Sequence, residues 1–343
     1  MPPRVPAVSS LAASSGGRPV PGLSLEGHRR ALVAGGVVLV ALAAVPLVAP
    51  RDDLLNLLFL VLLYVTLGES WNILGGYAGQ INLGHAAFFG VGTLVTRQSW
   101  LGGWPLPAAL LAGALAAVVV ALLIGLPTFR LRGVYFAIGT LALAEVLRIT
   151  VTNTMPNISA LSVSQLVSYS LQPRYYLALA LAAACVGATY VLAHSRLGLG
   201  MVAVREDEEA AEATGVDALR HKIAALVLSS LFAGLAGGVF AYYHVSYYLY
   251  LPFSPEYTFD PLLIVFIGGV GTVVGPVVGA FFFVIVREYL AQAITDAHLI
   301  VFGVLFILVV LLLPGGLVEA WHRLLRLARP GAPRVSSGEA MGT

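Results

Sequence analysis

The sequence predicts an all-α, polytopic membrane protein with eight to ten transmembrane helices. Of its 343 residues, 59% are hydrophobic and only 10% are charged, which lies outside the range of ordinary soluble domains. Uncharged runs of about 20 residues, the length that crosses a bilayer as a helix, recur along the chain. These runs lack the alternation of apolar and polar residues in barrel strands, so we expect helices.

The predicted spans follow one another along most of the chain. Six runs are long enough on their own to cross a bilayer, namely residues 31–50, 70–96, 98–129, 175–195, 223–255 and 261–286. Three further candidates are residues 54–68, 133–144 and 297–318. The polar stretch 152–173 separates two of these runs, and we expect it to hold a short surface helix.

Composition divides the chain into three parts. Residues 1–30 are rich in Pro, Ser and Gly and predict a disordered N-terminal tail. Residues 31–318 form the transmembrane domain, and residues 319–343 form a C-terminal tail. Basic residues cluster beside the first span, at 130–132, in the loop 196–222 and at 323–329. By the positive-inside rule these segments are cytoplasmic, so both termini lie in the cytoplasm.

Two glycine-rich stretches interrupt the apolar pattern, at residues 74–92 and 267–279. Each is either a helix broken near its middle or a site of close helix packing. For the second stretch the four-residue spacing of Gly271, Gly275 and Gly279 favours packing, and Gly234 and Gly238 have the same spacing. The candidate glycines for breaks or packing are Gly75, Gly76, Gly79, Gly84, Gly268, Gly269, Gly271 and Gly275.

Polar residues within the apolar regions are candidates for a translocation path. Gln80, Asn82 and His85 lie among the first set of glycines, and polar side chains at membrane depth usually face a cavity, a partner helix or a solute route. Glu69 is either functional or extends to the membrane surface. Glu145 has Arg148 one helical turn away, which favours a local ion pair at least as strongly as a proton relay.

The chain lacks the motifs of common enzymes and nucleotide-binding proteins. Its only lysine, Lys222, is followed by Ile223, so no P-loop is present. Neither HExxH nor GxSxG occurs, and no Cys, His and Asp residues have metal-ligand spacing. A net charge of +2 excludes a nucleic-acid partner. We therefore expect a protein that is not an enzyme and that holds neither a metal nor a cofactor of its own.

The loop 196–222, called the charged loop below, contains six of the 17 acids and the lysine. Strong helix formers predict a helix over 206–214, stopped by Gly215, with Asp217 capping a second helix. Helical spacing puts Glu206, Glu209 and Glu212 on one face and small residues on another. The helix is either a solvated connector or a docking helix for another protein.

Several long motifs of this chain resemble one transport family. EAAEATG, residues 209–215, fits the EAA-x-x-x-G pattern of coupling loops in permease subunits of bacterial ABC importers. The longer AVREDEEAAEATGVDALRHK is similar to the form in LivM-type permeases of the LivH/LivM branched-chain amino-acid family. GGYAGQINLGHAAFFGVG, RGVYFAIGTLALAEVLR and IGGVGTVVGPVVGA look like further family blocks. The resemblance covers about residues 54–314, although the wider consensus after the glycine is not kept here.

This resemblance implies a permease subunit of an ABC importer for branched-chain amino acids in the bacterial inner membrane. Its implied partners are a second, LivH-type permease, two cytoplasmic ATPases that hold ATP and Mg²⁺, and an extracytoplasmic solute-binding protein. The implied coupling residues are Arg205, Glu206, Asp207, Glu208, Glu209, Ala210, Ala211 and Gly215. Alternatives are a permease for urea, short amides or other amino acids, or an ion-coupled transporter or channel; an intramembrane enzyme has the least support.

Overall fold

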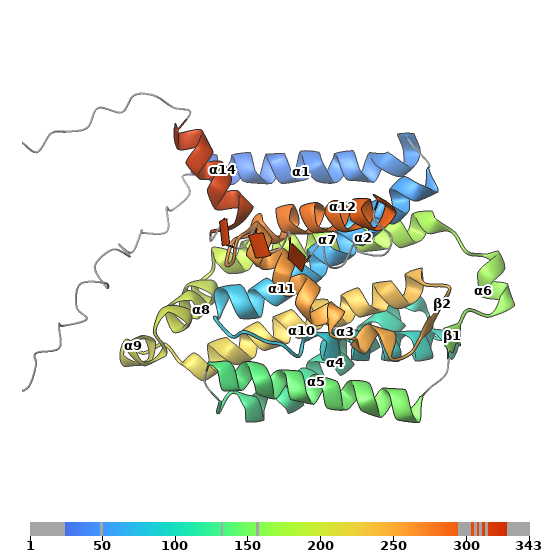
Figure 1. The fold of residues 1–343 in the computed structure, drawn as a ribbon, viewed down its shortest axis with the longest axis horizontal. Coiled ribbons are helices and arrows are strands. Elements are labelled where there is room, and N and C mark those ends of the chain that lie inside the picture. The colour runs from blue at the N-terminus through green and yellow to red at the C-terminus, as the bar shows by residue number, and fades with distance from the viewer. Residues whose placement is uncertain are drawn as a thin grey trace, which may run out of the picture. The chain divides into compact units, whose positions relative to one another are not determined.

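The computed structural model describes residues 25–48, 51–131, 133–155, 158–293, 303–304, 307–308, 311–312 and 315–327 (Figure 1). The chain divides into two compact units, residues 1–48 and 49–343. The described part of the first unit is α1 (Leu25–Val48), whose apolar portion is Leu32–Val48. Most of the predicted N-terminal tail, residues 1–24, and the chain end from 328 lie outside the described residues.

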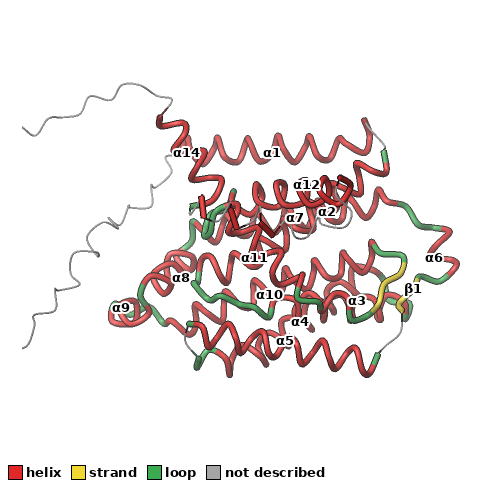
Figure 2. Tube along the Cα trace, in the orientation of Figure 1, coloured by secondary structure: helices red, strands yellow, loops and turns green. Residues whose placement is uncertain are grey.

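The second unit is built almost entirely of helices (Figure 2). Its first half contains α2 (Asp52–Asn72), the π-helix η2 (Ile73–Tyr77), α3 (His85–Leu101), α4 (Leu106–Thr128), α5 (Val134–Thr154), β1 (Ile158–Ala160) and α6 (Val163–Val167). Its second half contains α7 (Leu171–Ala193), α8 (Arg196–Glu206), α9 (Glu208–Ala213), α10 (Ala218–Tyr243), β2 (Ser246–Tyr248), η3 (Leu251–Phe253), α11 (Glu256–Gly268), α12 (Gly275–Ala293) and α14 (Gly316–Leu327).

Six helical segments among the described residues are long and apolar enough to cross a membrane. They are Asp52–Tyr77, Leu106–Thr128, Val134–Thr154, Leu171–Ala193, Ala218–Tyr243 and Gly275–Ala293. The predicted all-α, polytopic fold is therefore confirmed. The number of eight to ten spans stays a prediction, because α3 and α11 are shorter than a full span and the candidate 297–318 falls mostly outside the described residues.

The predicted boundary between spans 54–68 and 70–96 is wrong. A single helix runs from Asp52 through Glu69 to Tyr77, and the chain leaves helical structure only at residues 78–84. The two apolar runs were divided at Glu69 because it is charged, but Glu69 is completely buried among neighbouring helices. A buried acid places no constraint on where a helix meets water, so the break follows the glycines instead.

The centre of the second unit is α10, which packs against α2, α3, α4 and α7. Small residues allow these helices to approach closely. Gly234 faces Ala117 of α4, and a methyl group on Gly238 would lie 2.5 Å from a methyl carbon of Leu110. The packing predicted for Gly234 and Gly238 is therefore confirmed.

The helix α10 also separates two ends of the second unit. At 1.5 Å per residue its 26 residues extend about 39 Å. The charged loop with α8 and α9 lies at its start, called the charged-loop end (Figure 1). At its other end, called the hairpin end, β1 pairs antiparallel with β2. The short helix expected within 152–173 is α6, which is largely exposed.

Two buried arginines cap the end of α10 at the hairpin end. Arg97 donates hydrogen bonds to the carbonyls of Ala241, His244 and Val245 at 2.8–3.1 Å. Arg174 donates to the carbonyl of Tyr242 at 2.9 Å. The last carbonyls of a helix lack intrahelical donors and carry partial negative charge, so these cations supply both the missing donors and the opposite charge.

Candidate functional site

The charged loop folds into two short helices that meet at Asp207. The helix α8 ends at Glu206, and the extended Asp207 accepts a hydrogen bond from the backbone N–H of Ala210 at 3.0 Å. The predicted helix 206–214 therefore begins two residues later than expected, at Glu208. Asp207 takes the role of N-cap because its short carboxylate reaches the orphan amides of the first turn. Glu206 belongs to α8 and shares no helical face with Glu209.

The predicted end of this helix and the start of the next are confirmed. Gly215 follows α9 with φ of 91°, a left-handed conformation that glycine adopts without a steric cost. Asp217 then caps α10 by accepting a hydrogen bond from the N–H of Arg220 at 3.0 Å. These two residues fix the angle between α9 and the start of α10.

One side of α9 is held against the rest of the protein. Ala211 is buried in a small cluster with Val204 and Ala218. Beside it, Nζ of Lys222, which is only 6% exposed, lies 2.6 Å from the Glu208 carboxylate. Of the predicted coupling residues, Ala211 and Glu208 thus position α9 instead of facing outward.

The opposite side of α9 is open. Ala210, Ala213 and Thr214 are exposed, and so are Glu209 and Glu212. Small side chains flanked by acids give this side a flat surface with negative charge at its edges. Such a surface suits a groove of a partner protein that carries basic residues.

The first break comprises residues 78–84, between η2 and α3. Asn82 is buried there: its backbone carbonyl accepts a hydrogen bond from Nε1 of Trp71 at 2.9 Å, and its side-chain oxygen accepts from the N–H of Gly84 at 2.8 Å. Gln80 is half-buried, whereas Ile81 between them is 48% exposed. Non-helical backbone is tolerated at membrane depth only where protein buries it or where it lines a water-filled cavity. This segment must therefore be covered by protein or face such a cavity.

His85 begins α3 and is buried between helices. Its Nε2 lies 2.9 Å from the hydroxyl of Ser70, which itself donates to the carbonyl of Leu67. The next residue, Ala86, donates its N–H to the hydroxyl of Thr258 in α11 at 2.9 Å. Thr258 thus joins the start of α3 to the shorter helix before the second break.

Glu69 is the least satisfied polar residue of the predicted set. It is fully buried in α2, and neither carboxyl oxygen has a hydrogen-bond partner. Thr189 and Asn72 are polar neighbours but stand outside hydrogen-bonding geometry. The predicted alternative of a side chain that extends to the membrane surface does not hold for Glu69. Glu145, by contrast, pairs with Arg148 as predicted, with Nε 2.8 Å from Oε2.

The second break comprises residues 269–274, between α11 and α12. Gly268 and Gly275 are in direct backbone contact across it, and Gly279 packs on the carbonyl of Ile264. Gly269 departs from helical structure with φ of 136°. The packing interpretation of this stretch is therefore confirmed. Residues 269–274 form a turn between two helices that pack antiparallel, and α12 is long enough to be a span by itself, so the interpretation of one span broken near its middle is wrong here.

The side chain of Asn72, at the end of α2, joins that helix to the second break. Its Oδ1 accepts a hydrogen bond from the N–H of Gly271 at 2.8 Å, and its Nδ2 donates to the carbonyl of Thr272 at 3.0 Å. Gly76 lies beside this contact, where any side chain would strike Asn72 and Gly271. Asn72 thus satisfies backbone groups that the second break would otherwise leave without partners.

Arg205, at the end of α8, connects the charged loop to both breaks. Its Nη1 donates a hydrogen bond to the carbonyl of Gly76 at 2.7 Å. A methyl group on Gly79 would lie 2.6 Å from its Cγ, and one on Gly271 would lie 2.7 Å from its Nη1. Both glycines also have positive φ, of 69° and 71°. Only glycine meets both requirements here, so these positions accommodate Arg205.

The remaining glycines of the predicted set have packing roles. Gly75 lies against the ring of Trp71, and Gly84 lies against the backbone of Thr140 in α5. Among the predicted residues, the structure therefore brings together Arg205, Gly76, Gly79 and Gly271. Gln80, Asn82 and His85 line the neighbouring non-helical segment.

Replacing Asn72 with leucine is expected to destabilise the second break. The change leaves the N–H of Gly271 and the carbonyl of Thr272 unpaired, which costs about 2–4 kcal/mol in the free energy of unfolding. Thermal unfolding of the purified chain in detergent measures this. Asn72→Asp keeps the acceptor for Gly271 and should lose less. A leucine variant as stable as the wild type would show that Asn72 does not support the break.

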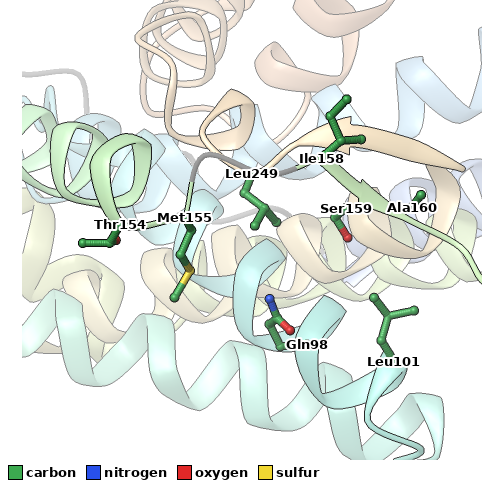
Figure 3. A pocket seen from close by; sticks show the side chains of 8 residues that line it. All are labelled: Gln98, Leu101, Thr154, Met155, Ile158, Ser159, Ala160 and Leu249. Atoms are coloured by element: carbon green, nitrogen blue, oxygen red, sulfur yellow. The ribbon is translucent and has the colours of Figure 1, made fainter.

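A pocket lies at the hairpin end, away from all of these residues (Figure 3). It has a volume of about 380 Å³ and is lined by Gln98, Leu101, Thr154, Met155, Ile158, Ser159, Ala160 and Leu249. Its lining contains no ionisable side chain, which gives it no group for acid–base catalysis. In the described part of the chain, no three His, Cys, Asp or Glu residues lie together as a metal site would require.

The fold and the site define a multi-pass helical membrane protein in which two glycine-rich, non-helical segments lie close to each other beside Arg205. The chain belongs to the family described as "Branched-chain amino acid transport system / permease component", which matches residues 54–310. It is thus a transport component, as its motifs predict.

Two curated relatives are similar over most of their length. The high-affinity branched-chain amino acid transport system permease protein LivM of Salmonella typhimurium is 29% identical over 89% of this chain and 77% of its own. LivM of Escherichia coli strain K12 is 29% identical over 86% of this chain and 76% of its own. No solved structure matches the chain.

Two residues important to this site, and one that caps α10 at the hairpin end, were missed in the sequence. Asn72 and Thr258 act on partners about 200 and 172 positions away, so no local spacing indicates them. Arg97 is the only charged residue between Glu69 and Arg130 in the sequence. A lone arginine within a long uncharged stretch must find hydrogen-bond partners inside the fold. This pattern could have indicated that Arg97 is buried and bonded.

Proposed function

We propose that the chain is the membrane-spanning permease subunit of an ABC importer for branched-chain, hydrophobic amino acids. The observation that carries this proposal is Arg205, which joins the exposed α9 segment to both helix breaks. A segment that a partner can push is thereby connected to the two places where the spans can change shape. The names of the LivM relatives support the substrate class.

ATP is hydrolysed on separate subunits in this proposal. The only lysine of the chain is occupied by Glu208 at 2.6 Å and lies at the start of a continuous helix, so it cannot serve as a phosphate-binding lysine. A phosphate loop needs a lysine that is free to reach the β- and γ-phosphates. ATP and Mg²⁺ therefore belong to partner chains, and this chain needs no cofactor of its own.

The charge distribution supports an orientation with the charged-loop end in the cytoplasm. Exposed Arg196, Arg205 and Arg220 lie at that end, as the positive-inside rule requires of cytoplasmic loops. Arg97 and Arg174 at the hairpin end do not count against it, because they are buried helix caps and not loop charges. We place the protein in the bacterial inner membrane, with both termini cytoplasmic.

Four partner chains complete the importer. Two ATPases bind on the cytoplasmic side, one of them at the exposed side of α9. A LivH-type permease covers apolar surface of the spans, and a solute-binding protein delivers substrate at the hairpin end. Gly215 and Asp217 set the angle of α9 toward the ATPase.

Transport proceeds by a change in the conformation of the two breaks. Closure of the ATPases on ATP pushes α9, and α8 carries the movement to Arg205 and hence to Gly76 and Gly271. The non-helical segment with Gln80, Asn82 and His85 shifts with them, and Glu69 lies one helical turn from Asn72. Substrate biases this equilibrium only as far as it binds one state more tightly than the other.

Docking at α9 is tested with Ala213→Arg. An arginine on the exposed small face should obstruct an ATPase groove, and the exposed position keeps the change in folding stability within about 0.5 kcal/mol. We expect ATPase subunits to co-purify with the wild type and with Ala213→Ser, and not with Ala213→Arg. Equal recovery with both variants would place the ATPase elsewhere.

A further inference from the structure

The helix α14 (Gly316–Leu327) belongs to neither break nor to the charged loop. Its sequence, GLVEAWHRLLRL, is strongly amphipathic. Helical spacing gathers all its ionisable residues along one side, namely Glu319, His322, Arg323 and Arg326. Leucine, valine, alanine and tryptophan make up the other side. Three of the four ionisable residues are basic or can become so, which gives this side an excess of positive charge.

The first turn of α14 rests on the second break. A methyl group on Gly316 would lie 2.7 Å from the backbone nitrogen of Gly269, and Val318 also approaches Gly269. From there α14 runs across the direction of α10, at the charged-loop end of the second unit (Figure 1). The protein therefore fixes where α14 starts and holds it crosswise to the spans.

Beyond this first turn a large apolar side chain of α14 is accessible. Trp321 is 62% exposed. On the polar side, Arg323 pairs with Glu319 at 2.7 Å but keeps 63% of its side chain accessible. A large aromatic residue and an accessible arginine thus stand on opposite sides of one helix.

The sequence places this helix at the surface of the bilayer. The apolar run 297–318, a candidate span, ends where α14 begins. A helix that follows a span directly and lies crosswise to it is at the level of the lipid headgroups. Tryptophan is enriched at that level, and helices with Trp and Leu on one side and Arg on the other lie in the interface plane.

We propose that α14 binds the anionic phospholipid surface of the leaflet at the charged-loop end. Its apolar side, with Trp321, enters the boundary between headgroups and acyl chains, and Arg323 with its basic neighbours contacts the anionic headgroups. That this leaflet is the cytoplasmic one rests on the proposed orientation; the contact with lipid does not. The second break is thereby tied to the membrane surface as well as to Arg205.

Spin labels on the two sides of α14 test this proposal in the full-length chain. The only cysteine, Cys185, is buried, so Cys185→Ala provides the background for Trp321→Cys and Arg323→Cys, two positions that lie about 160° apart around the helix. Each labelled protein is placed in nanodiscs that contain phosphatidylglycerol. We expect the label at 321 to be relaxed by oxygen and shielded from an aqueous nickel chelate, and the label at 323 to show the reverse.

The lipid charge is tested with the same label. Adding Arg323→Glu to Trp321→Cys, or using phosphatidylcholine alone, should lower the membrane-bound fraction about fivefold. Access of the nickel chelate to both labels would overturn the proposal. So would shielding at 321 that requires ATPase subunits, or that is indifferent to lipid charge. None of these readouts needs ATP or substrate, so a failure here is distinct from a failure of the proposed transport function.

Discussion

Arg205→Ala is expected to reduce transport strongly while leaving the subunits assembled. The variant loses the hydrogen bond from Nη1 to the carbonyl of Gly76 and the packing against Gly79 and Gly271. A hydrogen bond from a charged donor contributes about 1.5–3 kcal/mol, which corresponds to about a 10- to 100-fold loss if it operates in the transport step. Substrate-stimulated ATP hydrolysis and uptake by the reconstituted importer should fall by that factor.

A structural role alone would give a different result for Arg205. It lies at the end of α8, and Ala211, Lys222 and Glu208 hold α9 independently of it. Co-purification of ATPase should therefore survive in Arg205→Ala. Arg205→Lys retains the charge and one donor and should recover part of the uptake. Wild-type uptake by Arg205→Ala would rule out Arg205 as the connection between the charged loop and the breaks.

Arg97→Leu should have the largest effect on stability. Arg97 is fully buried and donates to three backbone carbonyls and to the hydroxyl of Ser159. Its removal takes a donor from the carbonyls of Ala241 and His244 at the end of α10 and removes the bond to Ser159 of β1. We expect the free energy of unfolding to fall by about 3 kcal/mol or more. Chemical denaturation in detergent micelles measures this loss.

Two controls separate the capping role of Arg97 from a general effect of losing an arginine. Arg51→Leu removes an exposed arginine and should change stability by less than about 0.5 kcal/mol. Arg97→Lys keeps the charge, but its ammonium lacks the planar set of donors with which the guanidinium reaches three carbonyls. Its loss of stability should therefore lie between those of Arg51→Leu and Arg97→Leu. If Arg97→Leu behaves like Arg51→Leu, the arginine does not cap α10.

Local chemistry made parts of this structure predictable from sequence. The apolar runs indicate helices because a bilayer offers no partners to an open backbone. Gly215 and Asp217 have their predicted roles because a helix stop and an N-cap depend on neighbours within four residues. The start of α9 was misplaced by two residues, because Asp207 and Glu206 both suit a first turn and only the fold decides which one caps.

Contacts distant in sequence could not be predicted in the same way. Glu69 was taken as a possible span boundary, and only the packing of α2 against its neighbours shows that it is buried. Arg205 was grouped with the coupling residues by motif, but its bond to Gly76 joins positions 129 apart. The bonds from Asn72 to the second break likewise depend on how α2 packs against α11 and α12. The glycines of the two breaks could be recognised in the sequence, but the closeness of the two breaks in space could not.

Uptake of radiolabelled leucine into proteoliposomes tests the central claim most directly. The chain is reconstituted with a LivH-type permease, two ATPases and the binding protein, and valine, isoleucine, urea and acetamide are added as competitors. We predict ATP-dependent uptake that valine and isoleucine inhibit, that urea and acetamide leave unchanged, and that Arg205→Ala strongly reduces. Uptake by this chain alone, driven by an ion gradient and indifferent to ATP, would contradict the account.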